Sequence, residues 1–175
     1  DFAFYAGNPS EELIRFKPHN CKQDFIIMVP QTEEWGRLIE KCYGDKVRKV
    51  TRYAIKKEPD VFDTKKLEQV VSSIPDGYEL KTIEESEYLM CRNNGWARDL
   101  VSQYKDYETY NKLGIGVAVL KDGELVAGAS SYSRYDKGIE IEIDTREDQQ
   151  RKGLAYACGA KLILECRKRD LYPSW

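Results

Sequence analysis

Apolar and polar residues in the second part of the chain follow two periods, one typical of strands and one typical of helices. Residues 139–143 alternate strictly between isoleucine and glutamate, which predicts a half-buried strand. Leu154, Cys158 and Leu162 recur every four positions, which predicts an amphipathic helix. The same patterns give, in chain order, a strand over 78–83, helical stretches over 84–92 and 97–104, strands over 115–120, 124–131 and 139–143, and a helix over 153–169. A strand meander that is followed by a long helix predicts an α+β fold.

The first part of the chain alternates short apolar runs with helical patterns. Strands are predicted over 2–5, 24–29 and 47–55, and helices over 10–16, 33–43 and 63–74. Thr32 and Asp63 stand where N-caps are expected, because their side-chain oxygens can accept hydrogen bonds from the free amides of a first turn. Pro75-Asp76-Gly77 is a turn signal. We therefore predict a small α/β N-terminal segment over 1–77 and a second domain over 78–175.

Charge and hydropathy narrow the class of protein. The 175 residues include 28 Lys and Arg and 30 Asp and Glu, which gives a net charge of −2. A chain with this balance has no overall positive field to hold a polyanion, so no nucleic-acid partner is expected. The basic stretch over 41–66 is interpreted as a solvated face. The longest apolar run, 25–29, is far shorter than the roughly 20 residues of a membrane helix, so no membrane partner is expected either.

The cysteines and the single histidine do not indicate a metal or nucleophilic site. The five cysteines are scattered without a C-x-x-C pair, so neither a zinc ribbon nor a disulfide framework is expected. Reduced thiols are typical of a cytoplasmic protein. His19 lies in a predicted loop with no nucleophile motif near it. No leader is visible, but the chain begins at Asp1 rather than Met, so we interpret it as a fragment.

The most informative stretch joins the strand over 139–143 to the long helix. Residues 146–152 form a polar loop, and Gln150, Gly153 and Ala155 make the pattern Q-x-x-G-x-A at the helix start. The free amides of the first turn and the positive end of the helix dipole favour a phosphate group. Three cations add positive charge beside them: Arg146, Arg151 and Lys152. The P-loop and dinucleotide-binding glycine patterns are absent, and a capped surface helix after an edge strand stays the alternative.

The order of these elements and motifs resembles the GNAT superfamily of N-acetyltransferases over residues 78–175. The family pattern of V-x-T, a short spacer and R/Q-x-x-G-L-A is matched by Ile143-x-Thr145 and, eight positions after Thr145, by Gly153-Leu154-Ala155. A narrower resemblance is to the branch that includes zwittermicin-resistance acetyltransferases. It rests on five motifs: Trp96-x-Arg98-Asp99, Ser130-Ser131, Glu140-Ile141-x-Ile143-x-Thr145, Arg151-Lys152-Gly153-Leu154-Ala155 and Leu171-Tyr172-Pro173-Ser174-Trp175. Residues 1–75 are similar to the N-terminal part of the same branch, which is interpreted as a degenerate GNAT-like half.

The resemblance implies a GNAT fold, which is a mixed and mostly antiparallel twisted sheet flanked by helices. The chain stops where the fifth strand of the superfamily begins, so the C-terminal part of the fold is expected to be missing. The implied cosubstrate is acetyl-CoA. Its pantetheine arm would pair with the backbone of Ile141, Glu142 and Ile143 like an added strand. Its pyrophosphate would be held by the loop and the first helical turn, at Gln149, Gln150, Arg151, Lys152, Gly153, Leu154 and Ala155.

In this superfamily the acceptor amine attacks the thioester directly, so a base must first take a proton from the ammonium group. Glu140 and Glu142 are the candidate bases, because both lie on the strand face opposite the isoleucines, at the edge where the coenzyme would lie. Two solvent-facing carboxylates of an amphipathic strand are the alternative. A bulge in this strand would decide which glutamate faces the acceptor. The acid that protonates the leaving thiolate is expected beyond Trp175.

The activity implied by the resemblance is transfer of an acetyl group to a primary amine of a small, antibiotic-like molecule. Two other functions stay open. One is a non-catalytic GNAT-like module that binds acyl-CoA, and the other is a tandem GNAT that transfers an aminoacyl group from tRNA. The mild acidity argues against the tRNA substrate. No metal is implied, and a homodimer is left open.

Overall fold

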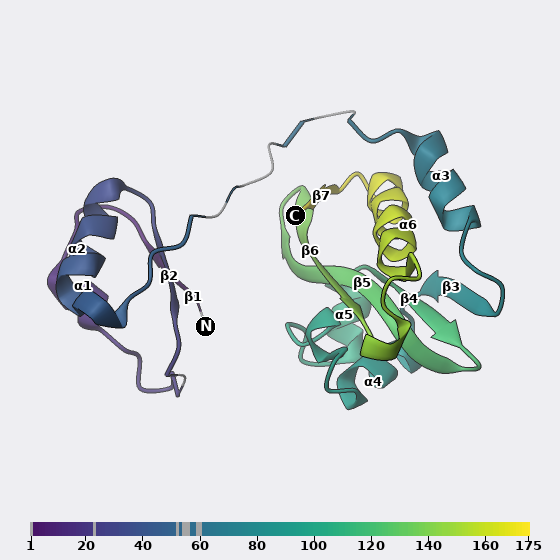
Figure 1. Cartoon of the computed structure of the whole chain (residues 1–175), viewed down its shortest axis with the longest axis horizontal. Coiled ribbons are helices and arrows are strands. Elements are labelled where there is room, and N and C mark those ends of the chain that lie inside the picture. Colours follow the sequence, from purple (N-terminus) through teal and green to yellow (C-terminus); the bar gives the residue numbers. More distant parts are fainter. Residues whose placement is uncertain (1, 23, 52, 54–56, 59–60) are drawn as a thin grey trace. The chain divides into compact units, whose positions relative to one another are not determined.

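Two compact units make up the chain, residues 1–53 and 54–175, and each is described by itself. The computed structural model describes residues 2–22, 24–51, 53, 57–58 and 61–175. Figure 1 shows the elements of both units. Within the described residues, no helix is long and apolar enough to cross a bilayer.

The smaller unit is a two-stranded sheet with helices packed on it. Strands β1 (Phe2–Tyr5) and β2 (Ile27–Pro30) pair in parallel. The helices are α1 (Glu11–Arg15), α2 (Glu33–Tyr43) and the short 3-10 helix η1 (Gly44–Lys46). The predicted cap at Thr32 is confirmed, because its Oγ1 accepts a hydrogen bond from the Trp35 amide at 3.4 Å. The buried core of this unit consists of Tyr5, Ile14, Trp35 and Ile39.

The strand predicted over 47–55 is wrong in its described part. Residues 47–51 and 53 form no strand, and residues 52, 54 and 55 lie outside the described part of the chain. Apolar residues alternate there with basic ones, but a strand becomes stable only when a neighbouring strand accepts its backbone hydrogen bonds. The two-stranded sheet of this unit provides no such neighbour.

The larger unit is built on one five-stranded sheet. Its strands, in their spatial order, are β3 (Tyr78–Thr82), β4 (Gly116–Lys121), β5 (Glu124–Tyr135), β6 (Gly138–Thr145) and β7 (Tyr172–Ser174). The first four pair antiparallel, and β7 joins β6 in parallel. The predicted α+β fold with a mixed, mostly antiparallel sheet is therefore confirmed.

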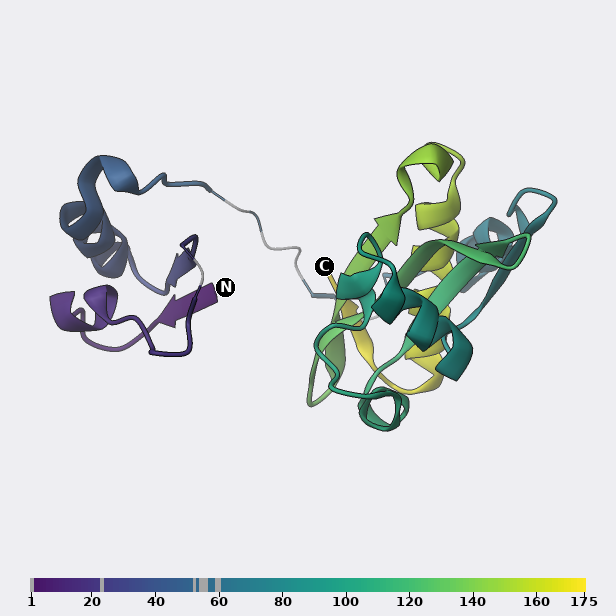
Figure 2. The ribbon, with the colours of Figure 1, turned by 90° about the horizontal axis from the view of Figure 1, so that it is seen from below.

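Helices cover both faces of this sheet (Figures 1 and 2). One face carries α6 (Leu154–Lys168), whose Leu154, Cys158 and Leu162 pack with Val117 in a buried cluster. The other face carries α4 (Glu85–Asn93), the 3-10 helix η2 (Arg98–Leu100) and α5 (Tyr107–Leu113), with a second buried cluster that is rich in tyrosine. Helix α5 was not predicted from the sequence, and the predicted helix over 97–104 is reduced to η2 and turns.

The bulges of the sheet lie in β5 and not in β6. Against β6, Ser131 faces Ile141 and Ser133 faces Glu140, so Tyr132 is the extra residue. A second shift occurs on the β4 side of the same strand. Because β5 is the longest strand, at 12 residues, and is paired on both sides, two bulges let it bend with the twist of the sheet. The alternation of side chains along β6 therefore continues without interruption.

Helix α3 (Thr64–Ser72) packs along α6, although its residues fall in the predicted N-terminal segment. Its predicted cap is confirmed, because Asp63 Oδ1 accepts from the Lys65 and Lys66 amides. By its contacts α3 belongs to the unit of residues 54–175. The predicted division at 77 and 78 stays a prediction about domains.

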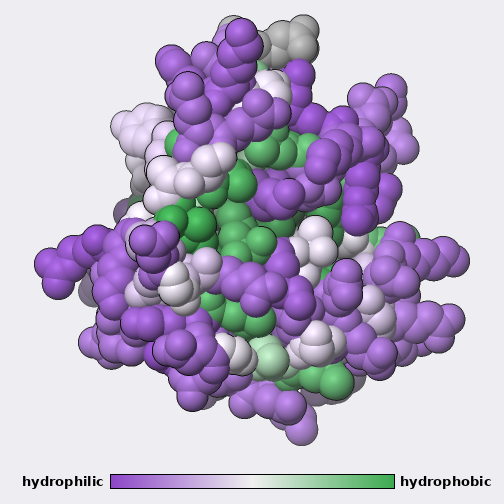
Figure 3. Space-filling view, turned by 90° about the vertical axis from the view of Figure 1, so that its right-hand side faces the viewer, coloured by the Kyte–Doolittle hydropathy of each residue, from purple (hydrophilic) through white to green (hydrophobic). Residues whose placement is uncertain are grey.

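The face of the molecule in Figure 3 is mainly hydrophilic, with hydrophobic side chains in a central group.

Candidate active site

Strand β6 loses its partner on one side partway along its length. It pairs with β7 only over residues 138–140, which lie opposite 172–174. Over residues 141–145, β6 still pairs with β5, but no described strand pairs with its other side. Within the described residues, the backbone groups on this side of 141–145 have no strand partner, and we call this side the open edge of β6.

The backbone groups that face this open edge follow from the hydrogen bonds of β6. The Arg146 amide donates to the Val126 carbonyl of β5 at 3.0 Å. Because backbone groups alternate between the two sides of a strand, Glu142 and Asp144 also face β5. The groups that face the open edge are those of Ile141, Ile143 and Thr145. Of the three residues predicted to pair with the pantetheine arm, Glu142 thus has its backbone turned the other way.

Helix α6 begins close after this edge, with its first amides free. Gly153, the N-cap, has φ +80°, and its carbonyl accepts the first helical hydrogen bond, from the Ala157 amide at 3.0 Å. No side chain caps this helix end. Arg151 also has positive φ, at +61°, so the chain turns sharply just before the helix. Free amides at a helix start, with no capping side chain, form a site for an anion.

The side chains of the loop before α6 bind mainly to the loop itself. The Gln149 side chain is buried, and its Oε1 accepts from Tyr78 Oη at 2.7 Å and from Lys152 Nζ at 2.8 Å. Gln149 Nε2 donates to Asp148 Oδ2 at 2.8 Å. Gln149 and Lys152 were predicted to bind the pyrophosphate, but in the structure their side chains brace the loop. Their contribution to a ligand is therefore the shape of the backbone.

Arg146 is likewise committed to the loop. Its guanidinium donates to Asp148 Oδ1 at 2.7 Å and to Glu124 Oε2 at 3.0 Å. These hydrogen bonds raise the pKa of Arg146 and lower the pKa of Asp148 to about 2. Arg151, by contrast, is exposed and forms no ion pair with any described residue. Of the three cations noted in the sequence, Arg151 is the one left to attract an anion.

The bond between Tyr78 and Gln149 is expected to stabilise this loop. Tyr78→Phe removes one donor to a buried amide oxygen, so the free energy of unfolding should fall by about 1 kcal/mol. Urea denaturation of both proteins measures the difference. Tyr156→Phe is the matched control, because the Tyr156 side chain is exposed on α6, and its loss of a hydroxyl should change nothing. Equal stability of Tyr78→Phe and wild type would contradict the bracing role.

The other face of β6 carries carboxylates. Ile139, Ile141 and Ile143 pack with α6, so Glu140, Glu142 and Asp144 point to the opposite face. Burial raises the pKa of Glu142, and the charges of Asp144 and Asp99 raise it further. Burial also raises the pKa of Asp144, and the charge of Asp99 raises it further. The carboxyl groups of Asp99, Glu142 and Asp144 therefore form one negative region on this face of β6.

The two glutamates predicted as bases lie in different electrostatic surroundings. The pKa of Lys57 is raised mainly because Lys57 Nζ donates a hydrogen bond to Tyr135 Oη at 2.9 Å, and the negative charge of Glu140 raises it further. Glu142 has acidic neighbours instead. A carboxylate among other carboxylates binds a proton more tightly than usual, which suits a general base. Its acidic surroundings therefore make Glu142 the better candidate base of the two.

Two members of this acidic region, Asp99 and Asp144, were not among the predicted site residues. Asp144 continues the alternation of Glu140 and Glu142, and that signal was available in the sequence. Asp99 comes from η2, more than 40 positions earlier, and only the fold brings it near β6.

In α6, burial raises the pKa of the Cys158 and Cys166 thiols to about 12, so both pack as core residues.

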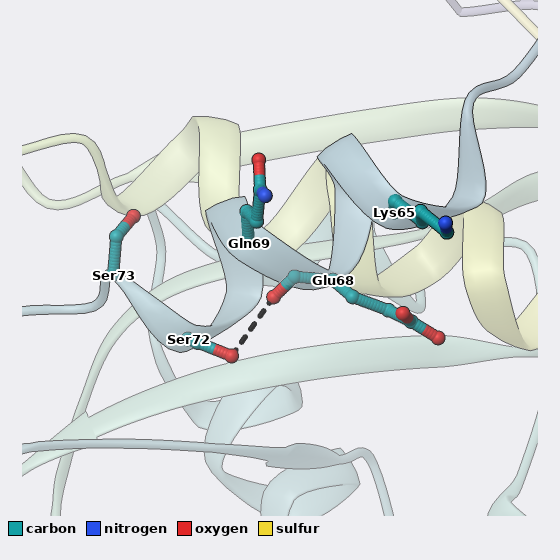
Figure 4. A pocket seen from close by; sticks show the side chains of 5 residues that line it. All are labelled: Lys65, Glu68, Gln69, Ser72 and Ser73. Carbon is teal, nitrogen blue, oxygen red and sulfur yellow. Dashed lines mark hydrogen bonds between the residues drawn. The ribbon is translucent and has the colours of Figure 1, made fainter.

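A shallow surface hollow of about 440 Å³ lies along α3, away from the β6 edge. It is lined by Lys65, Glu68, Gln69, Ser72 and Ser73. Figure 4 shows that these side chains point in different directions, and that Ser72 Oγ donates to the backbone oxygen of Glu68, at 2.9 Å. Because its polar side chains do not converge on a common point, this hollow has no features of a binding site.

Comparison with known proteins shows which class of protein has this fold. Residues 1–175 match the sequence profile of the GNAT acetyltransferases, so the chain belongs to the GNAT acetyltransferase family. The chain is similar to the uncharacterized N-acetyltransferase YdfB of Bacillus subtilis (strain 168), with 25% identity over 151 residues. That match covers 86% of this chain and 55% of YdfB, so the chain spans about half the length of this curated relative.

A solved structure is much more similar. It is a GCN5-related N-acetyltransferase-like protein from Streptococcus suis 89/1591, with 47% sequence identity and a TM-score of 0.88. The match covers 99% of this chain and 68% of that one. It supports the GNAT-like arrangement of a curled mixed sheet flanked by helices.

The residues present fit the acetyl donor of this family, acetyl-CoA. The free amides at the start of α6 suit a diphosphate, and the open edge of β6 suits an extended arm that contains amide groups. Within the described residues, no group of three or more His, Cys, Asp or Glu side chains is arranged to hold a metal ion.

Proposed function

We propose that this protein transfers the acetyl group of acetyl-CoA directly to a primary amine of a small, cationic molecule. The observation that carries the proposal is a pair of sites with free backbone groups, the open edge of β6 and the first turn of α6, which are joined by a short loop. Together they can bind an extended arm at one site and a diphosphate at the other. Membership of the GNAT acetyltransferase family supports the same activity.

In this proposal the donor is bound mostly by backbone. The groups of Ile141, Ile143 and Thr145 pair with the pantetheine arm as an added strand would. The amides from Arg151 to Ala155 bind the diphosphate, and the Arg151 guanidinium adds a charge–charge attraction. Gln149 and Lys152 act indirectly, since their side chains brace the loop that presents those amides.

The carboxylates on the other face of β6 serve the acceptor. An amine is an ammonium ion at neutral pH, and the negative region of Asp99, Glu142 and Asp144 attracts it. Glu142, whose pKa is raised, removes the proton so that the amine can attack the thioester carbon. The C–S bond then breaks, and the nitrogen loses its second proton as the CoA thiolate takes up a proton, which leaves the amide and the free thiol. A cationic, antibiotic-like acceptor agrees with the resemblance to the zwittermicin-resistance branch.

Two measurements test this function. Calorimetry with CoA and acetyl-CoA measures donor binding, and release of free thiol from acetyl-CoA on a panel of polyamines and amino sugars measures transfer. We expect binding of both coenzymes and thiol release only with an amine present. Tight binding without thiol release for any amine would favour a non-catalytic acyl-CoA-binding module. Salt-dependent binding of tRNA would favour aminoacyl transfer.

Some further expectations belong to the same proposal. The two-domain division at residues 77 and 78, a cytoplasmic location and an optional homodimer all stay predictions. Gel filtration of the whole protein measures whether it forms a homodimer.

A further inference from the structure

Gly128 lies in β5 at a point where three elements of the larger unit meet. It pairs with Asp144 of β6 on one side and with Ala118 of β4 on the other. Its neighbours in the chain, Ala127 and Ala129, are fully buried in the cluster that contains α6. Because side chains alternate along a strand, position 128 faces the opposite side of the sheet, where η2 packs.

A side chain at position 128 would collide with Leu100 of η2. A Cβ added to Gly128 would lie 2.7 Å from Leu100 Cδ1 and 3.2 Å from the carbonyl oxygen of Val117. The backbone does not itself require glycine, since Gly128 lies outside the left-handed region of φ. Leu100 is fully buried, so its side chain has little room to move aside. The missing side chain therefore provides the space in which η2 packs against the sheet.

The position of η2 determines how close the carboxylate of Asp99 lies to β6. Asp99 directly precedes Leu100, and its charge raises the pKa of both Glu142 and Asp144. Ser102 Oγ donates to Asp99 Oδ1 at 3.1 Å, so a neighbouring residue of the same segment orients this carboxylate. A displacement of η2 would therefore carry the Asp99 charge with it.

Two charged groups raise the pKa of Glu142, and they come from different elements. One is Asp144 on its own strand, and the other is Asp99 on η2. On β5, the residues in register with Glu142 and Asp144 are Ser130 and Gly128, which carry no charge. The distance between Asp144 and Glu142 is set by their strand, whereas that of Asp99 depends on the packing of η2.

The cations of the same two neighbouring elements do not act on Glu142. Arg98 of η2 is exposed, and Arg134 of β5 donates from Nη1 to the Leu113 carbonyl at 3.1 Å. Neither contributes to the raised pKa of Glu142. Helix α6 packs on the other face of the sheet.

We propose that Gly128 and Leu100 are positioning residues: their contact fixes Asp99 beside Glu142 and Asp144, and so sets the basicity of Glu142. Only the use of this basicity in catalysis rests on the proposed function. The placement of Asp99 is a property of the packing, and it can be measured without turnover.

Gly128→Ala tests this role, with the titration of Glu142 as the measurement. The added methyl group should push η2 away from the sheet, so Glu142 loses part of the repulsion from Asp99. The pKa of Glu142 should then fall by up to about half a unit. NMR of protein with ¹³C-labelled glutamate, assigned with Glu142→Gln, measures that pKa. The acid limb of kcat/KM should move to lower pH by the same amount.

Two double variants distinguish positioning from a general loss of stability. Gly128→Ala with Leu100→Val keeps the total volume nearly unchanged, so the wild-type pKa of Glu142 should return. Gly128→Ala with Leu162→Val makes the same leucine change in the α6 cluster, on the other face of the sheet, and should leave the pKa lowered. In an Asp99→Asn protein, Gly128→Ala should cause no further fall, because the displaced charge is already gone.

The outcomes separate this inference from the proposed function. An unchanged pKa of Glu142 in folded Gly128→Ala would overturn the inference, and so would a further fall in the Asp99→Asn background. Should Gly128→Ala not fold, Leu100→Ala removes the same contact from the other side, and the same two results decide. A lowered pKa in a protein that transfers no acetyl group would support the positioning role and show that the proposed function is wrong.

Discussion

Replacing Gly153 with glutamate is expected to weaken CoA binding by about a hundredfold or more, which is roughly 2.7 kcal/mol. Gly153 lies at the N-cap of α6, and the position of its missing Cβ is open space. A side chain there would enter the site proposed for the diphosphate. Its carboxylate would also occupy the positive end of the helix and repel the phosphates. Calorimetric titration with CoA measures the loss.

The matched control is Gly123→Glu. Gly123 has φ +79° in the turn between β4 and β5, again with open space around its Cβ position. The substitution therefore adds the same charge and the same backbone strain in a hairpin turn rather than at the start of α6. We expect a comparable loss of stability in both variants but normal CoA affinity in Gly123→Glu. A folded Gly153→Glu protein with wild-type affinity would contradict the placement of the diphosphate.

Glu142→Gln is expected to lower turnover by about a hundredfold or more and to leave the affinity for CoA intact. General-base catalysis contributes about 10²–10⁴ to a rate, and glutamine cannot accept the proton. The thiol-release assay at saturating donor measures turnover, and calorimetry measures affinity. Glu140→Gln is the control, because it lies on the same face of the same strand but near Lys57. It should have a far smaller effect, and full rates in both variants would mean that neither glutamate is the base.

The pH dependence of the reaction gives a second test of Glu142. The pKa of Glu142 is raised by burial and by the charges of Asp144 and Asp99. A base works only when deprotonated, so kcat/KM should fall as the pH falls through this raised pKa, above the usual range for glutamate. Asp99→Asn removes one of the causes and should move this limb to lower pH. An unmoved limb would show that another group titrates.

The same raised pKa affects stability in the opposite direction. A carboxyl group with a higher pKa in the folded state than in the unfolded state binds its proton more tightly when folded. Its contribution to stability is therefore largest below the ordinary pKa of glutamate and is lost as the pH rises through the raised value. Glu142→Gln should then unfold at a slightly higher temperature than wild type at neutral pH. A gain of stability together with a loss of rate is typical of a functional carboxylate.

Much of the larger unit was predictable because its local signals agree. The alternation over residues 139–143 gave β6, and the four-residue repeat from Leu154 gave α6. Thr32 and Asp63 marked two helix starts correctly, since a cap depends only on neighbouring residues. Helix α5 was missed because its seven residues carry a single buried side chain, Tyr110, and so show no period. The strand expected over 47–55 failed for lack of a pairing partner.

Side-chain roles in the loop before α6 were less predictable. Arg146 and Lys152 were expected to add positive charge beside the helix start because they are basic and lie close to Gly153 in the sequence. In the fold, the acceptors for both lie within hydrogen-bond distance in the loop and in Glu124. A cation whose hydrogen bonds are already made within the protein makes the loop more rigid. The spacing of charges in the sequence does not show which residue accepts those hydrogen bonds.

The sequence by itself determined the strand and helix on either side of Gly153, and with them the family resemblance from which the diphosphate site is proposed. Those features depend on residues within a few positions of one another. Only the tertiary structure decided that β7 joins β6 in parallel over residues 138–140 and that Asp99 lies near Glu142 and Asp144. Each of these needs segments far apart in the chain to meet, and local periodicity contains no information about which of them do.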